Sequence, residues 1–395
     1  MNVAPPQSQG FDTQRLARID DFVRERYLDS GRLPHAQLLI ARNGEIVHFS
    51  HQGPAREGGT PVDESTIFRI ASMTKPVTSL AFMMLVEAGK VSLDTPVHHV
   101  LPELKGVGVY AGGGNGAPFE TVPTAAPMRM IDLLRHTSGF TYGFQERTPV
   151  DAAQRESKME SWHGNLTLDE FVAALGKLPL EFSPGTEWNY SVSTDVLGLV
   201  VERLSGMKLA DFFEQRIFAP LGMRDTSFVV PPEKAHRLAD CWALAPDGAR
   251  VMYDRGEDSF WLREPRLASG GGGLVSTALD YHRFNRFFLG QGELEGARLV
   301  SRKTVELMTM NHLPGGSDLA SLSKSLFSET TNAGVGFGLG FAITTDVART
   351  LIPGSVGEFY WGGMFSTAFF IDPVERISMV FMTQFSPSTL YPIRR

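Results

Sequence analysis

In the stretch FRIASMTKPVTSLAFMMLVEAG, residues 68–89, one serine (Ser72) and one lysine (Lys75) stand just before a long apolar run. Within residues 77–89 the side chains are apolar nearly all the way round, which is typical of a helix buried in a core. Pro76 marks the start of this helix, because proline is tolerated only in a first turn. Ser72 and Lys75 then stand one turn apart on the same face, so that both side chains can point into one cavity.

The start of this helix offers two means of activating a serine hydroxyl. The Ser72 N–H belongs to the backbone donors that lack a helical partner, and the positive end of the helix dipole stabilises negative charge beside it. A desolvated Lys75 either favours its neutral form or lends its charge to a neighbouring base. An N-cap serine next to a surface lysine would explain the same pair. The Ser-x-x-Lys spacing also recurs in two segments that open no buried helix, SGMK (Ser205, Lys208) and SLSK (Ser321, Lys324).

Two later segments supply residues that could work with this pair. In FSPGTEWNYSVSTDVLGLVVERLSG, residues 182–206, Tyr190 precedes a predicted helix. A lone tyrosine in such a position is more often a buried aromatic side chain that only fills space in the core. In EFYWGGMFSTAFFID, residues 358–372, the triplet Trp361-Gly362-Gly363 leads into a predicted strand. Paired glycines there would let a ligand approach the backbone closely.

Taken together and in this order, the three motifs resemble those of the serine β-lactamase and penicillin-binding-protein superfamily. The context is most similar to class C β-lactamases and to their esterase relatives, the family VIII carboxylesterases. The resemblance covers roughly residues 15–385. It includes four further segments: LLRHTSGF (133–140), PLGMRDTSF (220–228), SGGGGLVSTALDYHRF (269–284) and GFGLGF (336–341).

This resemblance implies a role for each motif. Ser72 would be the nucleophile and Lys75 would tune the site, while Tyr190 would be the general base for acylation and would pass the proton to the leaving group. Water activated by the same Tyr–Lys pair would then release the acyl group. The backbone N–H groups of Ser72 and Met364 would form the oxyanion hole. An unperturbed tyrosine titrates near pH 10, so this role calls for a neighbouring cation such as Lys75.

Two departures from the β-lactamase pattern bear on the substrate. Val192 stands where the lactamases carry an asparagine after the tyrosine, and Trp361 stands where they carry a lysine. An indole cannot bind a carboxylate by charge, but it offers an apolar wall and one N–H donor. We therefore expect an uncharged ester with an apolar acyl or alcohol part. Trp361, Gly362, Gly363, Val192 and Tyr142 are the expected substrate-binding residues, although Tyr142 and Trp188 would suit the core equally well.

The leading hypothesis is thus a serine carboxylesterase that acts through an acyl-enzyme on short or medium acyl esters. The same site could serve an acyltransferase, a β-lactamase, or a D-amino-acid peptidase or amidase. A sensor that has lost catalysis is a further alternative, against which the intact Ser72, Lys75 and Tyr190 argue.

For the other candidate residues, the sequence indicates structural and not catalytic roles. The Gly-x-Ser-x-Gly elbow of α/β-hydrolases is missing, so Ser355 in PGSVGE is expected to lie in a loop. His136 is expected to cap a helix or to bond in the core rather than to complete a Ser-His-Asp triad. His98-His99 has no third ligand at useful spacing, so no metal and no cofactor are expected. Residues 112–116, GGGNG, are expected to form a loop, and Gly270–Gly273 to permit close backbone packing.

The two ends of the chain carry the predicted strands. HAQLLIARNGEIVHFSHQG gives two strand-like runs around Asn43-Gly44, and STAFFID with RISMVFMTQF gives a second pair around Pro373. Between them, residues 105–127 read as a long loop. We expect an α/β fold of the α+β type, in which an antiparallel sheet built from both chain ends is flanked by helices. The predicted helices of the middle region cover residues 129–136, 167–177, 193–205 and 208–217.

The predicted domains follow from this layout. Residues 1–100 and 266–395 would form a discontinuous α/β domain and residues 101–265 a mainly helical one, with the active site between them.

Composition limits the partners, the disulfide bonds and the cellular location that we expect for the protein. The chain has 395 residues, 21% of them charged, and a net charge of −7 without a basic run, which gives no reason to expect nucleic acid or an anionic membrane as partner. A single cysteine, Cys241, excludes an intramolecular disulfide. No signal-peptide pattern or membrane span is recognised, so we expect a cytoplasmic protein, or a periplasmic one if a leader was removed. The expected partner is a small-molecule ester, and homo-oligomerisation stays open.

Overall fold

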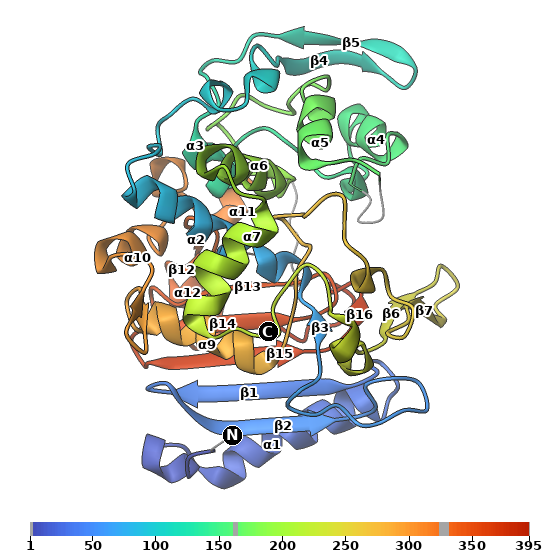
Figure 1. Ribbon diagram of the computed structural model, residues 1–395, viewed down its shortest axis with the longest axis vertical. Helices are drawn as coiled ribbons and strands as arrows, with labels where there is room; N and C mark the ends of the chain where they lie inside the picture. The colour runs from blue at the N-terminus through green and yellow to red at the C-terminus, as the bar shows by residue number, and fades with distance from the viewer. Residues whose placement is uncertain (1–2, 161–164, 324–331, 395) are drawn as a thin grey trace.

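Strands from both ends of the chain form one antiparallel sheet in this computed structural model, which describes residues 3–160, 165–323 and 332–394 (Figure 1). The order in the sheet is β11-β12-β13-β14-β15-β1-β2, so the first strand of the chain pairs with the last long one, Leu39 opposite Val380. The strands are β1 (Ala36–Arg42), β2 (Glu45–Gln52), β11 (Val335–Phe337), β12 (Ala342–Thr344), β13 (Phe359–Gly362), β14 (Ala368–Asp372) and β15 (Ile377–Met382). The predicted sheet of both chain ends is confirmed.

The turn between β1 and β2 shows why the local sequence predicts this hairpin. Asn43 and Gly44 have φ values of 54° and 83°, the left-handed pair that a two-residue hairpin turn requires. Along β1 the side chains alternate between two faces. Leu39 belongs to the main core, whereas Leu38 packs in a smaller apolar cluster on the other side of the sheet.

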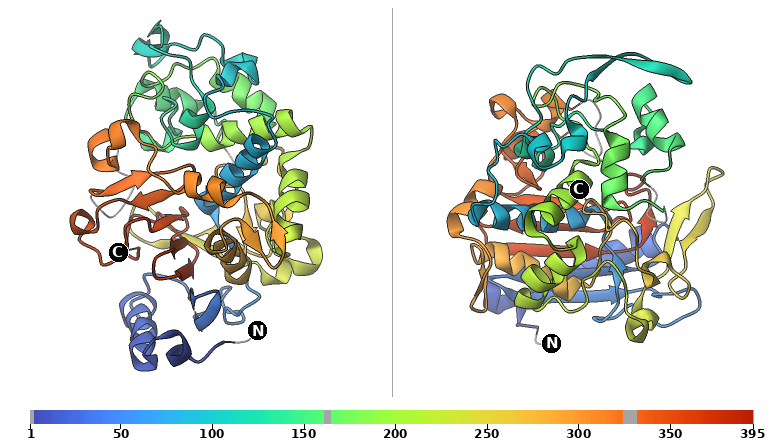
Figure 2. Two further views of the ribbon diagram at one scale, coloured as in Figure 1. Left: turned by 90° about the vertical axis from the view of Figure 1, so that its left-hand side faces the viewer. Right: turned by 45° about the horizontal axis from the view of Figure 1, so that its top comes forward.

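Helices cover the two faces of the sheet unequally. Helix α9 (Ala278–Leu289) packs on β1, β14 and β15. Helix α1 (Thr13–Val23) lies at the other end of the molecule from the hairpin of β4 (Val109–Gly114) and β5 (Ala117–Val122) (Figures 1 and 2). It meets β2, where His48 Nε2 and Asp20 Oδ1 are 3.0 Å apart. Helix α2 (Thr74–Glu87) lies inside the molecule and packs against α6 (Ser193–Ser205), with eleven buried residues from Thr74 to Leu85. The apolar run is therefore a core helix, as predicted.

The middle of the chain contains the four predicted helices and also helices and strands that were not predicted. The predicted helices are α3 (Met130–Leu134), α5 (Leu168–Leu175), α6 (Ser193–Ser205) and α7 (Leu209–Phe213), and the additional ones are α4 (Pro149–Glu156) and α8 (Ala219–Leu221). The prediction of one long loop at residues 105–127 is wrong, because β4 (Val109–Gly114) and β5 (Ala117–Val122) pair there. Gly113 and Gly114 have positive φ and interrupt the register, so the strand alternation is hidden in the sequence.

Smaller elements complete the fold. Among the described residues, no helix is long and apolar enough to cross a membrane. The division into an α/β domain and a mainly helical domain stays a prediction. The remaining elements are β3 (Phe68–Arg69), β6 (Cys241–Leu244), β7 (Arg250–Asp254), β8 (Val275–Ser276), β9 (Glu293–Leu294), β10 (Ala297–Arg298), β16 (Phe385–Ser386), α10 (Arg302–Met308), α11 (Leu319–Leu322) and α12 (Val347–Thr350).

Candidate active site

Ser72 lies on a short 3₁₀ turn, Ala71–Met73, directly before α2. Pro76 is the third residue of α2, within the first turn as predicted. The turn begins with Ala71 at φ 44°, a left-handed conformation that is uncommon for a residue with a Cβ. This conformation redirects the chain from β3 into the helix and leaves the Ser72 side chain partly exposed, at the edge of a depression.

Lys75 has an acceptor for each of its three ammonium protons. Nζ donates to Ser72 Oγ at 3.2 Å, to Tyr142 Oη at 3.0 Å and to the Gly271 carbonyl at 2.6 Å. The side chain is only 2% exposed, so these acceptors replace water around the amine. Nζ also lies 4.6 Å from the centre of the Tyr190 ring. Lys75 is thus a buried residue that joins Ser72, Tyr142 and the Gly271 carbonyl by hydrogen bonds, and not a surface lysine.

Tyr190 reaches the same serine from another part of the chain. Its Oη and Ser72 Oγ are 2.6 Å apart, the separation of a short O–H···O hydrogen bond. Since Lys75 Nζ bonds to the same Oγ, the three residues that the sequence analysis placed together meet at one oxygen atom. The geometry allows a proton to pass between the serine hydroxyl and the phenol without rearrangement.

Tyr142 lies in the site and not elsewhere in the core. Its Oη accepts the Lys75 hydrogen bond, and its ring centre is 5.3 Å from that of Tyr190. Burial, together with the charge of Asp195 and the neighbouring phenol of Tyr190, raises the pKa of Tyr142 well above 10. Tyr142 therefore stays protonated and positions the amine, which separates its role from that of Tyr190.

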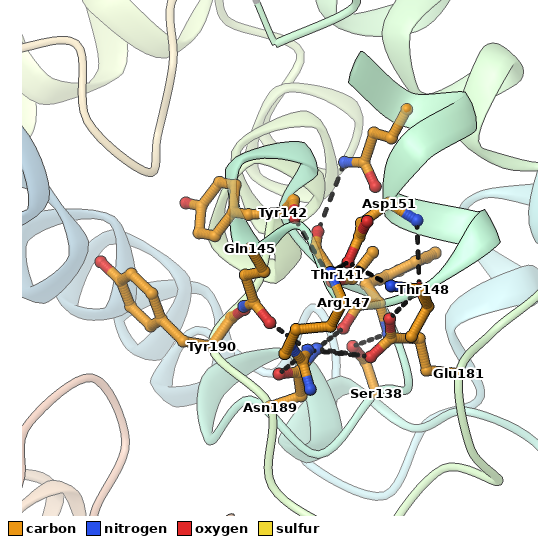
Figure 3. A network of polar contacts seen from close by, with 12 residues as sticks. Ser138, Thr141, Tyr142, Gln145, Arg147, Thr148, Asp151, Glu181, Asn189 and Tyr190 are labelled. Atoms are coloured by element: carbon orange, nitrogen blue, oxygen red, sulfur yellow. Dashed lines mark hydrogen bonds and ion pairs between the residues drawn. The ribbon is translucent and has the colours of Figure 1, made fainter. Parts of the chain in front are cut away.

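A polar network holds the backbone next to these two tyrosines (Figure 3). Asn189, the residue before Tyr190, donates through Nδ2 to Glu181 Oε2 at 3.1 Å. Arg147 Nη2 bonds to Asn189 Oδ1 at 2.9 Å and pairs with the Glu181 carboxylate at 3.1 Å. Figure 3 shows the rings of Tyr142 and Tyr190 pointing to one side, away from this network. The network thus fixes the two segments while the phenols face Ser72.

Gly270–Gly273 and Asp195 together position Lys75. The glycine run was expected from the sequence, but Asp195 was not. Asp195, in the first turn of α6, accepts hydrogen bonds from Ser269 Oγ at 2.5 Å and from the Gly271 N–H at 3.0 Å. A Cβ at Gly271 would lie 2.4 Å from Asp195 Oδ2, and one at Gly270 would lie 2.8 Å from the Thr194 carbonyl. The predicted close packing of Gly270–Gly273 is confirmed, and it delivers the Gly271 carbonyl to the amine. An acidic residue in a helical first turn is so common that nothing in the sequence distinguishes Asp195.

His136 has the core role that was predicted for it. It is buried at φ 57°, and its Nδ1 lies 3.3 Å from Ser191 Oγ, not next to Ser72. Its ring is 5.0 Å from that of Tyr190. Burial, with a smaller contribution from the nearby Lys75 charge, lowers the pKa of His136 well below 6.5, so that the imidazole is neutral.

The expected substrate-binding residues line one depression. It measures about 1220 Å³ and continues from Ser72 past the C-terminal segment onto the sheet face that α1 partly covers. Its lining includes all the substrate-binding residues expected from the sequence: Tyr142, Val192, Trp361, Gly362 and Gly363, with Met364 beside them. Trp361 and Gly362 end strand β13 and do not lead directly into β14, because residues 363–367 form a turn between the two strands.

Trp361 forms an apolar wall beside Tyr190. Its ring centre is 5.5 Å from that of Tyr190 and 5.3 Å from that of Phe337. The indole therefore occupies space next to the phenol with carbon atoms, where a cation would be needed to attract a carboxylate.

The two glycines of the Trp-Gly-Gly triplet are explained by packing within the protein. A Cβ at Gly363 would lie 2.4 Å from the Ile70 carbonyl, and a Cβ at Gly362 would lie 2.6 Å from Arg394 Cζ. Their small size lets β13 approach the turn that carries Ser72 and also makes room for a guanidinium. Close approach of a ligand is not needed to account for either residue.

The other sequence patterns considered as catalytic candidates do not contribute to the site at Ser72. Lys208 is exposed and pairs with Glu202, while Ser205 donates to the Val201 carbonyl inside α6. Lys324 of the third Ser-x-x-Lys pattern lies outside the described residues. Ser355 lies in a loop, as predicted, and donates to Asp372 Oδ2 at 2.7 Å. Within the part of the chain that the structure describes, no group of three or more His, Cys, Asp or Glu side chains could hold a metal ion.

The chain is similar to known proteins over nearly its whole length. The beta-lactamase family matches residues 19–394. Esterase EstB of Burkholderia gladioli is 32% identical, covering 96% of this chain and 93% of EstB, and Protein Rv1367c of Mycobacterium tuberculosis (strain ATCC 25618 / H37Rv) is 34% identical, covering 91% and 88%. The solved structure of EstCE1, a hydrolase with promiscuous acyltransferase activity, has a TM-score of 0.79 at 26% identity and covers 96% of each chain. The chain therefore belongs to the beta-lactamase family, within the serine β-lactamase and penicillin-binding-protein superfamily and close to the family VIII carboxylesterases.

Proposed function

We propose that the protein is a serine carboxylesterase that hydrolyses uncharged esters with short or medium acyl chains through an acyl-enzyme on Ser72. The observation that carries this proposal is the 2.6 Å contact between Tyr190 Oη and Ser72 Oγ, with Lys75 Nζ 3.2 Å from the same oxygen. A nucleophile, a base and a cation within hydrogen-bond reach are what acyl transfer to a serine requires.

Acylation begins when Tyr190, as a phenolate or through shared protons, takes the Ser72 proton and Oγ attacks the ester carbonyl carbon. The carbonyl oxygen becomes an oxyanion, which the backbone N–H groups of Ser72 and Met364 stabilise by hydrogen bonds. The C–O bond to the alcohol then breaks, and Tyr190 gives its proton to the departing oxygen. Lys75, whose ammonium faces the Tyr190 ring and bonds to Oγ, stabilises the negative charge as it moves between the two oxygens.

Deacylation repeats the steps with water in place of the alcohol. Tyr190 takes a proton from the water, the hydroxide oxygen attacks the acyl carbon, and the second tetrahedral intermediate collapses with release of the carboxylic acid. Ser72 Oγ receives its proton back from Tyr190. Tyr142 and the Gly271 carbonyl keep Lys75 in place through both halves of the reaction.

The walls of the site support an uncharged, apolar substrate. Trp361, Tyr142 and the buried Val192 present mainly carbon atoms to the depression that Ser72 faces. A penicillin or cephalosporin carries a carboxylate that would lie unpaired beside the indole, which is unfavourable where water is excluded. The site therefore favours esters over β-lactams.

The experiment is ester hydrolysis with p-nitrophenyl acetate, butyrate and longer homologues, run beside nitrocefin. Ser72→Ala should abolish turnover, and a serine-directed phosphonate should add to Ser72 in the parent protein, as mass spectrometry would show. Ser205→Ala, in the second Ser-x-x-Lys pattern, is the matched control and should leave both results unchanged. Unaltered hydrolysis by Ser72→Ala would overturn the proposal, and preferred turnover of nitrocefin would overturn the assigned substrate class.

Acyl transfer to an alcohol is a second candidate activity. Its support is the likeness to EstCE1, a hydrolase with promiscuous acyltransferase activity. The apolar walls of the depression would also favour an alcohol over water as the acceptor of the acyl group. Adding increasing amounts of butanol and measuring how the acyl group divides between butyl ester and free acid would separate the two activities.

A further inference from the structure

A partly buried guanidinium lies against the Trp-Gly-Gly triplet. Arg394 Nη2 donates a hydrogen bond to the Gly363 carbonyl and a second, of 3.2 Å, to the Thr367 carbonyl. A Cβ at Gly362 would lie 2.6 Å from Arg394 Cζ and 2.7 Å from Nε, so the guanidinium occupies the space that a side chain at Gly362 would need. Arg394 therefore packs against the end of β13 through both a hydrogen bond and close contact.

The carbonyl that Arg394 binds shares a peptide unit with the Met364 N–H. A trans peptide is planar, and its C=O and N–H point in opposite directions. Fixing the direction of the Gly363 carbonyl thus fixes the direction of the Met364 N–H on the other side of the unit. No acceptor for that N–H occurs among the described residues, and Met364 lines the depression with 39% of its surface exposed.

The hydrogen bonds to this carbonyl also strengthen the opposite donor. The Gly363 carbonyl accepts from the Ser366 N–H at 3.1 Å as well as from Arg394. Donors on the oxygen of an amide draw electrons toward that oxygen and leave the N–H more positive. A charged donor polarises the amide more than a neutral one. The full positive charge also lies one peptide unit from the position where negative charge would develop, in surroundings that screen it less than water does.

We propose that Arg394 is a positioning residue that orients and polarises the Gly363–Met364 peptide, so that the Met364 N–H is a stronger oxyanion donor. The inference rests on the proposed function, which assigns that N–H to the oxyanion hole. Arg394 would act through this peptide and not on the reacting atoms, because its hydrogen bonds to the Gly363 and Thr367 carbonyls lie on the side of the peptide opposite the Met364 N–H. The interaction should act on the transition state, where the carbonyl oxygen carries charge, and much less on the bound ester.

The first test compares Arg394→Met with Arg298→Met, an exposed arginine paired with Glu293 on the surface. We expect Arg394→Met to lower kcat about tenfold with little change in KM, less than the roughly 100- to 1,000-fold loss that follows removal of an oxyanion-hole donor itself. Arg298→Met should match the parent. An unchanged kcat for Arg394→Met, or a change confined to KM, would overturn the inference.

A spectroscopic measurement separates polarisation from a general structural effect. The infrared carbonyl band of the Ser72 acyl-enzyme, formed by rapid mixing with a carbonyl-labelled p-nitrophenyl ester, reports the strength of the hydrogen bonds to that carbonyl. The band should move to higher wavenumber in Arg394→Met. The same band position in the two proteins would contradict the inference even if kcat had fallen.

Coupling to Gly362 provides an independent check. Gly362→Ala should displace the guanidinium and lower kcat. The same change in the Arg394→Met background should lower it less, because the added Cβ then meets the Thr367 carbonyl, 2.8 Å away, but no guanidinium. Equal effects in the two backgrounds would count against the inference. If the parent protein lacks esterase activity and forms no Ser72 adduct, the proposed function itself fails. If the parent protein is active and the Arg394 variants have the same kcat, only the role of Arg394 is removed.

Discussion

Tyr190 Oη lies 2.6 Å from Ser72 Oγ, although 118 residues separate the two along the chain. Ser72 precedes α2 and Tyr190 precedes α6, and these two helices pack against each other in the core. Because both helices begin at the same end of their contact, the residues just before them meet. The juxtaposition is therefore a consequence of helix packing, and it gives the phenol a defined partner.

Removal of the Tyr190 hydroxyl should affect catalysis more than removal of the Tyr142 hydroxyl. Tyr190→Phe deletes the hydroxyl that exchanges a proton with Ser72 in the proposed mechanism. We therefore expect kcat to fall by roughly 100- to 10,000-fold, the range for general acid–base groups, with KM little changed. Tyr142→Phe deletes one acceptor of Lys75 and should give a smaller loss. Steady-state kinetics with p-nitrophenyl butyrate would measure both. Equal losses would show that the two phenols share the base role.

Lys75→Met should nearly abolish acylation while leaving the fold intact. Methionine fills a similar volume but supplies no charge to the Tyr190 ring and no donor to Ser72 Oγ. The rate of Ser72 labelling by a phosphonate should fall together with kcat, because both require an activated hydroxyl. Lys208→Met, at the exposed lysine of the second Ser-x-x-Lys pattern, is the control and should label at the parent rate. Normal labelling of Lys75→Met would remove Lys75 from the mechanism.

A methyl group at Gly271 should damage both stability and activity. The added Cβ would lie 2.4 Å from Asp195 Oδ2, so the backbone must shift and carry with it the carbonyl that binds Lys75 Nζ. We expect the free energy of unfolding to fall by about 1–3 kcal/mol, as for other overpacked sites. Gly112→Ala serves as the control, because the added Cβ would meet only the Glu120 side chain, with Oε2 nearest at 3.1 Å. Urea unfolding followed by circular dichroism would compare them, and equal stabilities would refute the packing argument.

The stability of the protein should decrease on mild acidification, in part because of His35. Burial lowers the pKa of His35 to about 4, whereas an unfolded histidine titrates near 6.5. Between these two values the unfolded chain binds a proton that the folded protein does not, so the contribution is fully present above pH 6.5 and is lost as the pH falls toward 4. His35 alone should remove about 2 kcal/mol between pH 7.5 and pH 5.

His35→Asn isolates this contribution, because an amide in place of the ring can still donate to the Pro54 carbonyl, which His35 Nδ1 contacts at 2.9 Å. The free energy of unfolding of this variant should depend less on pH than that of the parent. The comparison uses urea unfolding at both pH values. The same pH dependence in the two proteins would show that His35 is not the residue responsible.

Local patterns in the sequence predicted the hairpin at Asn43-Gly44, the buried helix behind Pro76 and the pairing of Ser72 with Lys75. Each depends on residues a few positions apart, so backbone geometry alone links the pattern to the structure. The hairpin at residues 109–122 was missed for the same reason, since its glycines interrupt the alternation that marks a strand.

The sequence by itself determined which side chains were available for chemistry and which two of them share a helix start. The motif resemblance had already assigned Tyr190 to Ser72, but only the tertiary structure decided the contact distance between them and placed Tyr142 on Lys75. It also decided that Asp195 and Arg394 hold the backbone next to the site. These contacts join segments that are distant along the chain. Their distances depend on how α2, α6 and β13 pack and on glycines that let backbones approach, and no periodicity within one segment encodes that packing.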